Sequence, residues 1–409
     1  MKRAGIITAA VLLALTAAGV ESAEPLKATV IHWWTSKGEA AAVRQFAAAY
    51  DRAGGQWIDK AVPDPYLARS TAINLIVDGD PPTAAQFNMS KQFHDIIDQG
   101  LLNNVDQVAI RENWDKILPS AILDSIKVEG HFYAAPVDIH MPVWFFYSKP
   151  AFQKAGIRTE PTTFAEFVAD LDRLKAAGMI PLAIGAQPWQ EKIVFDAILA
   201  DVGGPDLYLK VYRDHNLNAV NSVAFKDVLA SFKRLHAYID PDSQTRNWND
   251  ATALLISGRA GVQIMGDWAK GEFSVVKQTA GKDFGCFPGL GPRAPYIVGG
   301  DVFVFPKTDD PGAIKAQQLL ATVITSPQAQ VAFSAKKGSI PIRSDVDDSS
   351  LDICAREGIA IMRDRSRLLP NAELLMPPDM NDALLGVIAH FWNSSQSADD
   401  AQRAFASAL

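Results

Sequence analysis

Aromatic side chains stand next to polar ones at several places in this sequence, in stretches with the composition of turns. A flat, apolar ring beside carboxylates and amides suits a carbohydrate, because a pyranose has an apolar C–H face and a rim of hydroxyl groups that both donate and accept hydrogen bonds. The pattern therefore predicts a sugar-binding site. Its candidate residues are Trp33, Trp34 and Glu39 in "IHWWTSKGE", Gln187 and Trp189 in "AQPWQ", Asp267 and Trp268 in "MGDWAKGE", and Asp301 after "GG".

Each candidate also has an ordinary structural interpretation. Ser36 and Glu39 are spaced as a capping box at the start of a helix, which explains both residues without a ligand, although the two roles can coexist. Trp33 and Trp34 point to opposite sides if they continue a strand, so one can pack in a core while the other faces a cleft. Trp268 follows an apolar strand and can close a core in the same way.

The position of these turns favours the binding interpretation. In open α/β sheets, ligands bind beyond the carboxyl ends of the strands. The aromatic residues at 33–34, 187–189 and 267–268 each lie at or just past the end of an expected strand, so one shared site is predicted.

The elements that must position this site alternate between strands and helices, which is the pattern of an α/β fold. The helix at 163–178 has the clearest pattern, with Thr163 and Glu166 spaced as a capping box and Gly178 as its stop. The first helix is expected after the first strand, with Val43, Phe46, Ala47 and Tyr50 at helical spacing and "DRAGG" at its end. Further helices are expected at 224–239, 251–258, 311–325 and 381–392. Strands are expected at 27–34, 83–88, 132–139, 143–148, 179–185, 261–265 and 301–306.

Length and charge limit the class of protein. The 409 residues suffice for two or three domains, and the net charge of −7 argues against nucleic acid as a partner. Residues 1–23 combine Lys2-Arg3 with a short apolar run and small residues, which predicts a cleaved signal peptide and an exported, periplasmic protein. Cys286 and Cys354 are the two cysteines, and the sequence leaves open whether they pair.

Familiar catalytic motifs do not occur in the sequence. It has no Gly-rich phosphate loop, no G-x-S-x-G elbow and no H-E-x-x-H pair, and its seven histidines are scattered. An exported glycoside hydrolase with Asp267 and Asp301 as its two carboxylates remains an alternative, since such enzymes need only a suitably spaced pair. A sugar-sensing ectodomain is a further alternative.

Longer stretches of the sequence resemble the periplasmic glucose/mannose-type sugar-binding proteins of ABC importers, in extracellular solute-binding protein family 1. They are "HWWTSKGEAAAV" (32–43), "IPLAIGAQPWQ" (180–190), "RNWNDATALLISGRAGVQIMGDWAKGEF" (246–273) and "KKGSIPIR" (336–343). The resemblance implies a two-lobed α/β periplasmic-binding-protein fold, type II-like, with the ligand held between lobes joined by hinge crossovers. It implies an N-terminal lobe of residues 24–138 and 296–345 and a C-terminal lobe of residues 139–295 and 346–409.

The resemblance also assigns roles to single residues. It implies paired cleft tryptophans at Trp33 and Trp34, an acidic residue at Glu39, a stacking ring at Trp268 and an acidic residue at Asp301. It adds Lys337 of the "KGSIP" turn, although a lysine pair is usually solvated surface charge. It also adds His140 of "IHM", although a lone histidine is more often structural.

Two departures from the family pattern narrow the expected ligand. The family's lysine in "AQIKG" is replaced by Asn88 in "AQFNM", unless Lys91 takes its place, and the family's "SMAHGMA" segment is absent near the C-terminus. Asn371, Glu373 or Asp379 are candidates to replace that segment. The expected protein is a monomer without a cofactor that binds a mono- or oligosaccharide and delivers it to an ABC permease.

Overall fold

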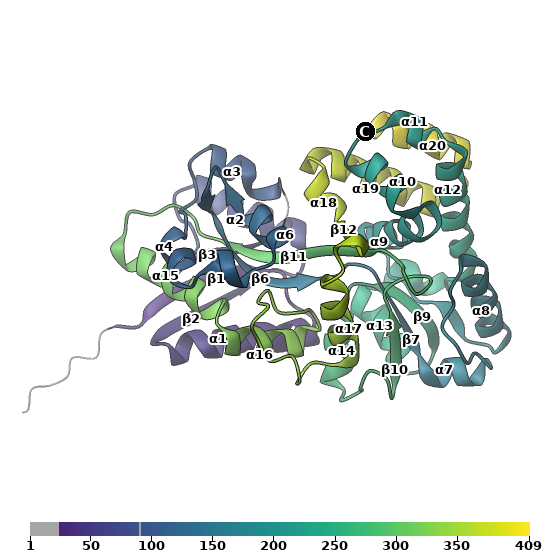
Figure 1. The fold of residues 1–409 in the computed structure, drawn as a ribbon, viewed down its shortest axis with the longest axis horizontal. Helices are drawn as coiled ribbons and strands as arrows, with labels where there is room; N and C mark the ends of the chain where they lie inside the picture. Colours follow the sequence, from purple (N-terminus) through teal and green to yellow (C-terminus); the bar gives the residue numbers. More distant parts are fainter. Residues whose placement is uncertain (1–23, 90) are drawn as a thin grey trace, which may run out of the picture.

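Two lobes, each built around its own β-sheet, make up the protein (Figure 1). This computed structural model describes residues 24–89 and 91–409. The predicted two-lobed α/β fold is thereby confirmed. The signal peptide predicted at 1–23 lies outside the described residues.

The larger sheet belongs to the first lobe. Its strands run in the order β12-β11-β3-β1-β2, and β6 pairs with β11 as well. Strand β1 is parallel to β2 and β3, whereas β11 is antiparallel to β3 and β6. The strands are β1 (Leu26–His32), β2 (Gly55–Ala61), β3 (Ala84–Asn88), β6 (Ala134–His140), β11 (Tyr296–Val304) and β12 (Leu368–Pro370).

The smaller sheet belongs to the second lobe and has the order β10-β7-β9-β8. Strands β8 and β9 are parallel, and β7 is antiparallel to both β9 and β10. The strands are β7 (Trp144–Ser148), β8 (Ile180–Leu182), β9 (Ala260–Met265) and β10 (Phe284–Phe287); a short hairpin elsewhere joins β4 (Lys127–Val128) and β5 (His131–Phe132).

Helices cover both sheets. Around the first sheet lie α1 (Lys37–Arg52), α2 (Pro65–Val77), α3 (His94–Asp98), α4 (Asp106–Arg111), α5 (Trp114–Ile117), α6 (Ser120–Ile126), α15 (Pro311–Ile324) and α16 (Pro327–Lys337). The remaining helices are α7 (Lys149–Lys154), α8 (Phe164–Ala176), α9 (Pro188–Ile198), α10 (Gly204–Tyr212), α11 (Leu217–Val220), α12 (Val223–Leu235), α13 (Trp248–Ile256), α14 (Ala269–Val275), α17 (Ile353–Met362), α18 (Ala372–Leu375), α19 (Pro378–Asn393) and α20 (Ala398–Ala408).

Most expected elements lie close to their predicted places, and four strands were missed. The strand expected at 301–306 is the second half of β11, which begins at Tyr296, and the stretch 132–139 divides between β5 and β6. Strands β2, β4, β10 and β12 were not predicted. β4, β10 and β12 have two, four and three residues, so their hydrophobic patterns are too short to distinguish. β2 has seven residues, but it is largely exposed and has no clear apolar pattern.

The first turn of α8 corrects one detail of the prediction. Thr163 accepts a hydrogen bond from the backbone N–H of Glu166, as expected for a cap. The Glu166 carboxylate, however, accepts from the backbone N–H and hydroxyl of Thr162, not from Thr163. The reciprocal half of the capping box is therefore shifted by one residue.

Strands β6 and β11 connect the two lobes (Figure 1). The first residues of β11 pair with β12, while the residues from Gly299 to Val304 pair with β6 in the first-lobe sheet. A Cβ atom on Gly300 would lie 2.4 Å from the carbonyl oxygen of Asp138 on β6, so glycine is required where the two connecting strands approach each other.

A second contact between the lobes lies at the start of α1. The backbone N–H of Gly38 donates a hydrogen bond of 2.7 Å to the carboxylate of Glu272 on α14. A Cβ on Gly38 would lie 2.5 Å from the carbonyl carbon of Gly271, so the two segments touch through their backbones. The helix N-terminus and the carboxylate attract each other, because the unpaired N–H groups carry partial positive charge.

Two further facts answer questions that the sequence left open. Cys286 on β10 and Cys354 on α17 form a disulfide bond with a Cα–Cα distance of 6.2 Å. Among the described residues, none of the helices is long and apolar enough to span a bilayer.

The disulfide gives the first prediction. The unfolded protein, kept free of reductant, should show no free thiol in a thiol titration, and reduction should lower the free energy of unfolding by about 2–4 kcal/mol, because the bond limits the unfolded chain. Denaturant unfolding of the wild type and of the Cys286→Ser/Cys354→Ser variant measures this loss. Free thiols in the unreduced protein would contradict the assignment.

Candidate functional site

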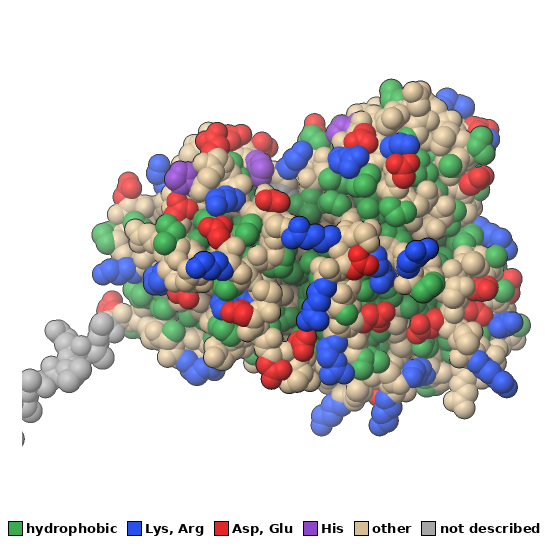
Figure 2. All heavy atoms as spheres, in the orientation of Figure 1, with side chains coloured by type: hydrophobic (Ala, Val, Ile, Leu, Met, Phe, Trp, Pro, Cys, Tyr) green, Lys and Arg blue, Asp and Glu red, His purple; other side chains and the backbone are tan. Residues whose placement is uncertain are grey.

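A cavity of about 1050 Å³, part of it open to solvent, lies between the lobes, where the surface is visibly hollowed (Figure 2). Residues from both lobes and from the connecting strands line it. They are Trp33, Thr35, Glu39, Pro63, Pro65, Tyr66, Arg69, Asn88, His140, Pro142, Gln187, Trp189, Lys192, Ile193, Asp196, Trp248, Trp268, Asp301, Lys337, Asn371 and Glu373. Nine of the twelve residues predicted for the site are among them.

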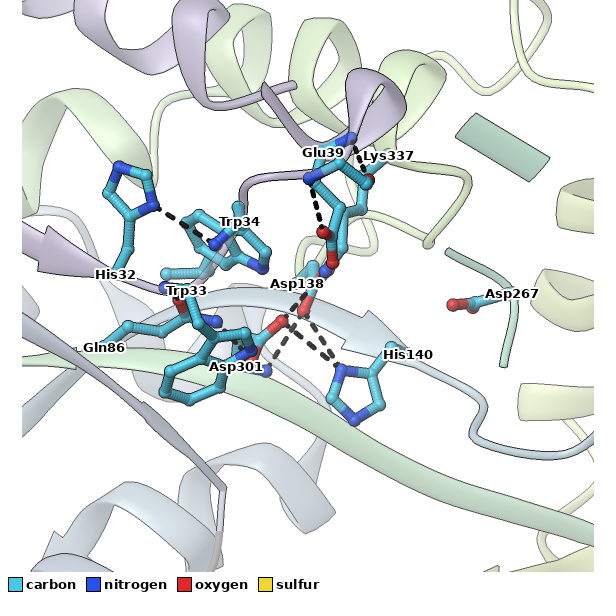
Figure 3. Close-up of polar contacts among 12 residues, drawn as sticks. His32, Trp33, Trp34, Glu39, Gln86, Asp138, His140, Asp267, Asp301 and Lys337 are labelled. Atoms are coloured by element: carbon cyan, nitrogen blue, oxygen red, sulfur yellow. Dashed lines mark hydrogen bonds and ion pairs between the residues drawn. The ribbon is translucent and has the colours of Figure 1, made fainter. Parts of the chain in front are cut away.

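The two adjacent tryptophans have different surroundings. Strand β1 ends at His32, so the chain turns at this point and the two indoles project in different directions (Figure 3). Trp33 is half-buried and lines the cavity, and its backbone N–H donates to Gln86. Trp34 is 1% exposed and packs against Phe303 and Phe333. Trp34 is therefore a core residue that does not line the cavity, contrary to its predicted role.

Lys337 is a buried lysine between two buried carboxylates. Its Nζ lies 3.1 Å from Asp301 Oδ2 and 3.5 Å from Asp138 Oδ2, and 5.0 Å from the centre of the Trp34 ring. Burial by itself favours neutral groups, but the mutual attraction outweighs it: the pKa of Lys337 is raised and the pKa of Asp301 is held well below its usual value. Lys337 is thus charged and fixed in place, unlike the solvated lysine that is usual at the surface.

Gln86 and His140 complete this cluster (Figure 3). Gln86 donates to Asp301 Oδ1 at 2.9 Å, so it connects Asp301 to the backbone of Trp33. His140 Nδ1 lies 3.4 Å from Asp301 Oδ2. Burial lowers the pKa of His140, but the nearby carboxylates outweigh burial and raise it. The sequence assigned no role to Gln86, because nothing about a strand glutamine shows that its partner lies more than 200 residues away.

The carboxylates of this cluster also have the arrangement of a possible metal site. Ligand atoms of Asp138, His140 and Asp301 lie within 4.8 Å of one another. The ammonium group of Lys337 already supplies the positive charge between the two carboxylates. A metal ion at this position would have to displace it, so the residues do not favour a metal ion.

Glu39 combines the two roles that the sequence left open. Its backbone N–H donates to the Ser36 hydroxyl and its carboxylate accepts from the Ser36 backbone, which completes the capping box of α1. The same side chain lines the cavity, and burial raises its pKa to about 7, although Lys337 opposes this rise. Glu39 can therefore donate or accept a hydrogen bond near neutral pH.

The second lobe supplies an aromatic wall. Trp268 follows β9 and lies edge-on to His140, with ring centres 5.3 Å apart. The ring centre of Trp189 lies 6.3 Å from that of Trp268. Gln187 accepts hydrogen bonds from the backbone N–H of Trp248 and from Gln190, so it orients the loop in front of α9. Trp33 of the first lobe lines the same cavity as these rings.

Two positions of the sequence depart from the family pattern, and the structure shows which of the candidate replacement residues line the cavity. Asn88 lines the cavity and donates a hydrogen bond of 2.7 Å to Glu373, whereas Lys91 is exposed and does not line it. Asn371 and Glu373 line the cavity, and Asp379 does not. Lys91 therefore does not replace the family's lysine by a loop shift.

Asp267 is buried and does not line the cavity, and its side chain lies apart from the cluster around Asp301 (Figure 3). Its carboxylate accepts a hydrogen bond from the backbone N–H of Met141, which fixes the chain between β6 and β7, and burial raises its pKa to about 7. Asp267 therefore has a structural role, and the prediction that it contacts the ligand is wrong. Asp267 and Asp301 cannot flank a glycosidic bond, because one of them does not reach the cavity.

Several lining residues were not foreseen from the sequence. Tyr66 and Arg69 lie on α2, Trp248 begins α13, and Lys192 and Asp196 form an ion pair within α9. Lys192 and Asp196 have the i, i+4 spacing of a helical pair, which the sequence does show. Tyr66 and Arg69 have no such pattern in the sequence. They line the cavity because α2 lies close to the other lobe, which the sequence does not show.

Comparisons with known proteins agree with this geometry. The family model described as bacterial extracellular solute-binding protein matches residues 34–331. A protein from Brucella melitensis named "Probable sugar-binding periplasmic protein" is 36% identical over 409 residues, which cover 98% of this chain and 96% of that protein. The chain belongs to the bacterial extracellular solute-binding protein family.

Solved structures show the same fold. A structure described as a chitin oligosaccharide binding protein has a TM-score of 0.80 at 17% identity and covers 94% of this chain and 98% of its own. A bacterial solute receptor described as preferring β-D-galactopyranose has a TM-score of 0.79 at 19% identity, with coverage of 93% and 97%. Members of this family bind solutes and do not turn them over, so the expectation that the chain is not an enzyme is confirmed.

The different surroundings of the two tryptophans give the second prediction. Trp34→Ala should lower the free energy of unfolding by about 3–5 kcal/mol, since it leaves a cavity among Phe303 and Phe333. Trp33→Ala should lower the free energy of unfolding by at least about 2 kcal/mol less, because the Trp33 ring is only partly buried and lines the cavity. Denaturant unfolding compares the two variants, and equal losses would contradict their assignment to core and cleft.

The buried ion pair gives the third prediction. Lys337→Met should lower the free energy of unfolding by about 3–5 kcal/mol near pH 7, because Asp301 is left charged, buried and without its cation. The matched control is Lys336→Met. Lys336 is the exposed neighbour of Lys337, so this substitution should change the stability by less than about 0.5 kcal/mol.

The pH dependence distinguishes this mechanism from lost packing. Without Lys337, burial raises the pKa of Asp301 in the folded state above its unfolded value, so its unfavourable contribution appears as pH rises through that folded pKa. The deficit of Lys337→Met relative to wild type should therefore be smaller near pH 4 than near pH 7. A deficit that does not change with pH would indicate lost packing instead.

Proposed function

We propose that this protein captures a sugar in the cavity between its lobes and delivers it to an ABC-type membrane permease. The observation that carries the proposal is that Trp33, Trp189 and Trp268 surround the same cavity as the buried Asp301, His140 and Lys337 cluster. The rings can cover the C–H faces of a pyranose, while the fixed charges can bind its hydroxyl groups.

The affinity that such a protein needs supports a cavity that closes. A dissociation constant of about 1 μM corresponds to about −8 kcal/mol, or roughly −0.7 kcal/mol per heavy atom for a hexose of about twelve. This value requires nearly complete burial of the ligand. Contacts from both lobes favour a closed state that binds more tightly than an open one, so ligand binding shifts the population towards closure.

The relatives support the remaining parts of the proposal. Their names include "sugar-binding" and "periplasmic", which agrees with export by a signal peptide at 1–23 and with a periplasmic location. The predicted lobe boundaries, the monomeric state and the permease partner remain parts of this proposal. Asn88 and Glu373 line the cavity where the family pattern differs, so the proposed ligand is a sugar and not glucose or mannose in particular.

The fourth prediction tests the proposed function directly. Calorimetric titration with a panel of mono-, di- and oligosaccharides should identify at least one ligand, and Trp268→Ala should weaken that ligand by at least about tenfold, because a stacking face is lost. Trp57→Ala is the matched control, since Trp57 lies on β2 and does not line the cavity. Its affinity for the same ligand should equal that of the wild type.

Two outcomes would contradict the proposal. If no sugar in the panel binds, the carbohydrate assignment is wrong. If Trp57→Ala weakens binding as much as Trp268→Ala does, the ligand does not occupy this cavity.

A further inference from the structure

Three glycines, each directly after a lysine in the sequence, meet where the two lobes touch. They are Gly38 in α1, Gly271 in α14 and Gly338 at the end of α16, and these three helices lie side by side (Figure 1). A Cβ atom on Gly271 would lie 2.9 Å from the carbonyl oxygen of Lys336, and one on Gly338 would lie 2.4 Å from the carbonyl oxygen of Asp267. Gly271 also faces Gly38, so the two lobes meet here backbone against backbone.

The close approach of the lobes is what requires two of these glycines. Gly338 has a φ of 97°, a conformation that glycine adopts without strain. Gly38 and Gly271 lie within helices, where glycine is less favourable than alanine, but a side chain at either position would meet the backbone of the other lobe. At these glycines the two surfaces meet without interlocking side chains, so they can separate there without opening a packed core.

Glu272 connects the lobes across this junction. Its carboxylate accepts the hydrogen bond of 2.7 Å from the backbone N–H of Gly38, and the residue is 8% exposed. Among the described residues, this N–H is the one hydrogen-bond partner of the carboxylate. The bond therefore exists only while the lobes are together, and water would solvate both groups once the lobes part.

The junction lies next to the cavity between the lobes but is not part of its lining. Glu39, Trp268 and Lys337 line the cavity, and each stands within three residues of one of the glycines in the sequence. Gly38 and Glu272 do not line it. A substitution of Gly38 or Glu272 can therefore change how firmly the lobes close without removing a contact to the ligand.

We infer that Glu272 is a positioning residue for ligand capture, whose hydrogen bond to the Gly38 N–H holds the lobes closed and breaks when they open. This inference rests on the proposed function and adds the contact that limits ligand release. A ligand first meets the open protein, in which the bond is absent, so the bond has little effect on the association rate. The bond stabilises the closed complex, so it slows dissociation.

The fifth prediction concerns the release of the tightest sugar of the calorimetric panel, followed by stopped-flow tryptophan fluorescence. Glu272→Ala should raise the dissociation rate constant by about tenfold, because one hydrogen bond to a charged group is lost. The association rate constant should stay within about twofold of the wild type. Glu272→Gln should restore most of the loss, because the amide oxygen can accept the same hydrogen bond. Gly38→Ala should also speed dissociation, because its methyl group would hold the lobes apart.

Two controls separate this role from a general effect on the fold. Gly386→Ala is the matched control for Gly38→Ala, since a Cβ on Gly386 in α19 would meet no atom within 4 Å. Its rate constants should equal those of the wild type. In denaturant unfolding without ligand, Glu272→Ala should have the same midpoint as the wild type, because the open protein lacks the bond.

The outcomes distinguish this inference from the proposed function. If a sugar binds the wild type and Glu272→Ala releases it at the wild-type rate, the proposed function stands and the inference is wrong. A lower unfolding midpoint of Glu272→Ala without ligand would show that the bond persists in the open protein, which also contradicts the inference. If no sugar in the panel binds the wild type, the proposed function fails and the inference fails with it.

Discussion

The buried pair of Asp301 and Lys337 is the interaction on which the arrangement of the site depends. Asp301 lies on β11, which connects the lobes, and Lys337 ends α16. Removing two opposite charges from water is unfavourable unless the geometry satisfies both, and here Gln86, His140 and Asp138 supply the remaining contacts. The pair thereby fixes the place where the connecting strands and the first lobe meet.

The pair of Asp301 and Lys337 connects the aromatic and the polar side chains of the site through direct contacts. Trp34 lies under Lys337 and packs in the first-lobe core, so the core supports the charge. Gln86 connects Asp301 to the backbone of Trp33, whose ring faces the cavity. His140 meets Trp268 of the second lobe edge-on. A ligand that binds these groups therefore contacts both lobes through side chains that already touch one another.

Much of the site could be predicted because its residues follow strand ends. Trp33, Gln187 and Trp268 each follow a strand whose hydrophobic pattern is clear, and sheet geometry brings those ends together. The roles of Trp34, Asp267 and Lys91 could not be predicted in the same way. Whether a side chain after a strand faces a core or a cleft depends on a turn of one or two residues. Trp34 and Asp267 are the direct neighbours of Trp33 and Trp268, which line the cavity, and Lys91 lies just after the end of β3.

The sequence by itself determined the family, the alternation of strands and helices, and the association of aromatic rings with carboxylates and amides, because these depend on local spacing and on motifs. The tertiary structure alone decided which tryptophan packs, the pairing of Cys286 with Cys354, and the approach of α2 to α18 that brings Arg69 and Glu373 to the same cavity. These features depend on contacts between residues far apart in the chain, whose distances are set by the packing of whole lobes and not by any local pattern.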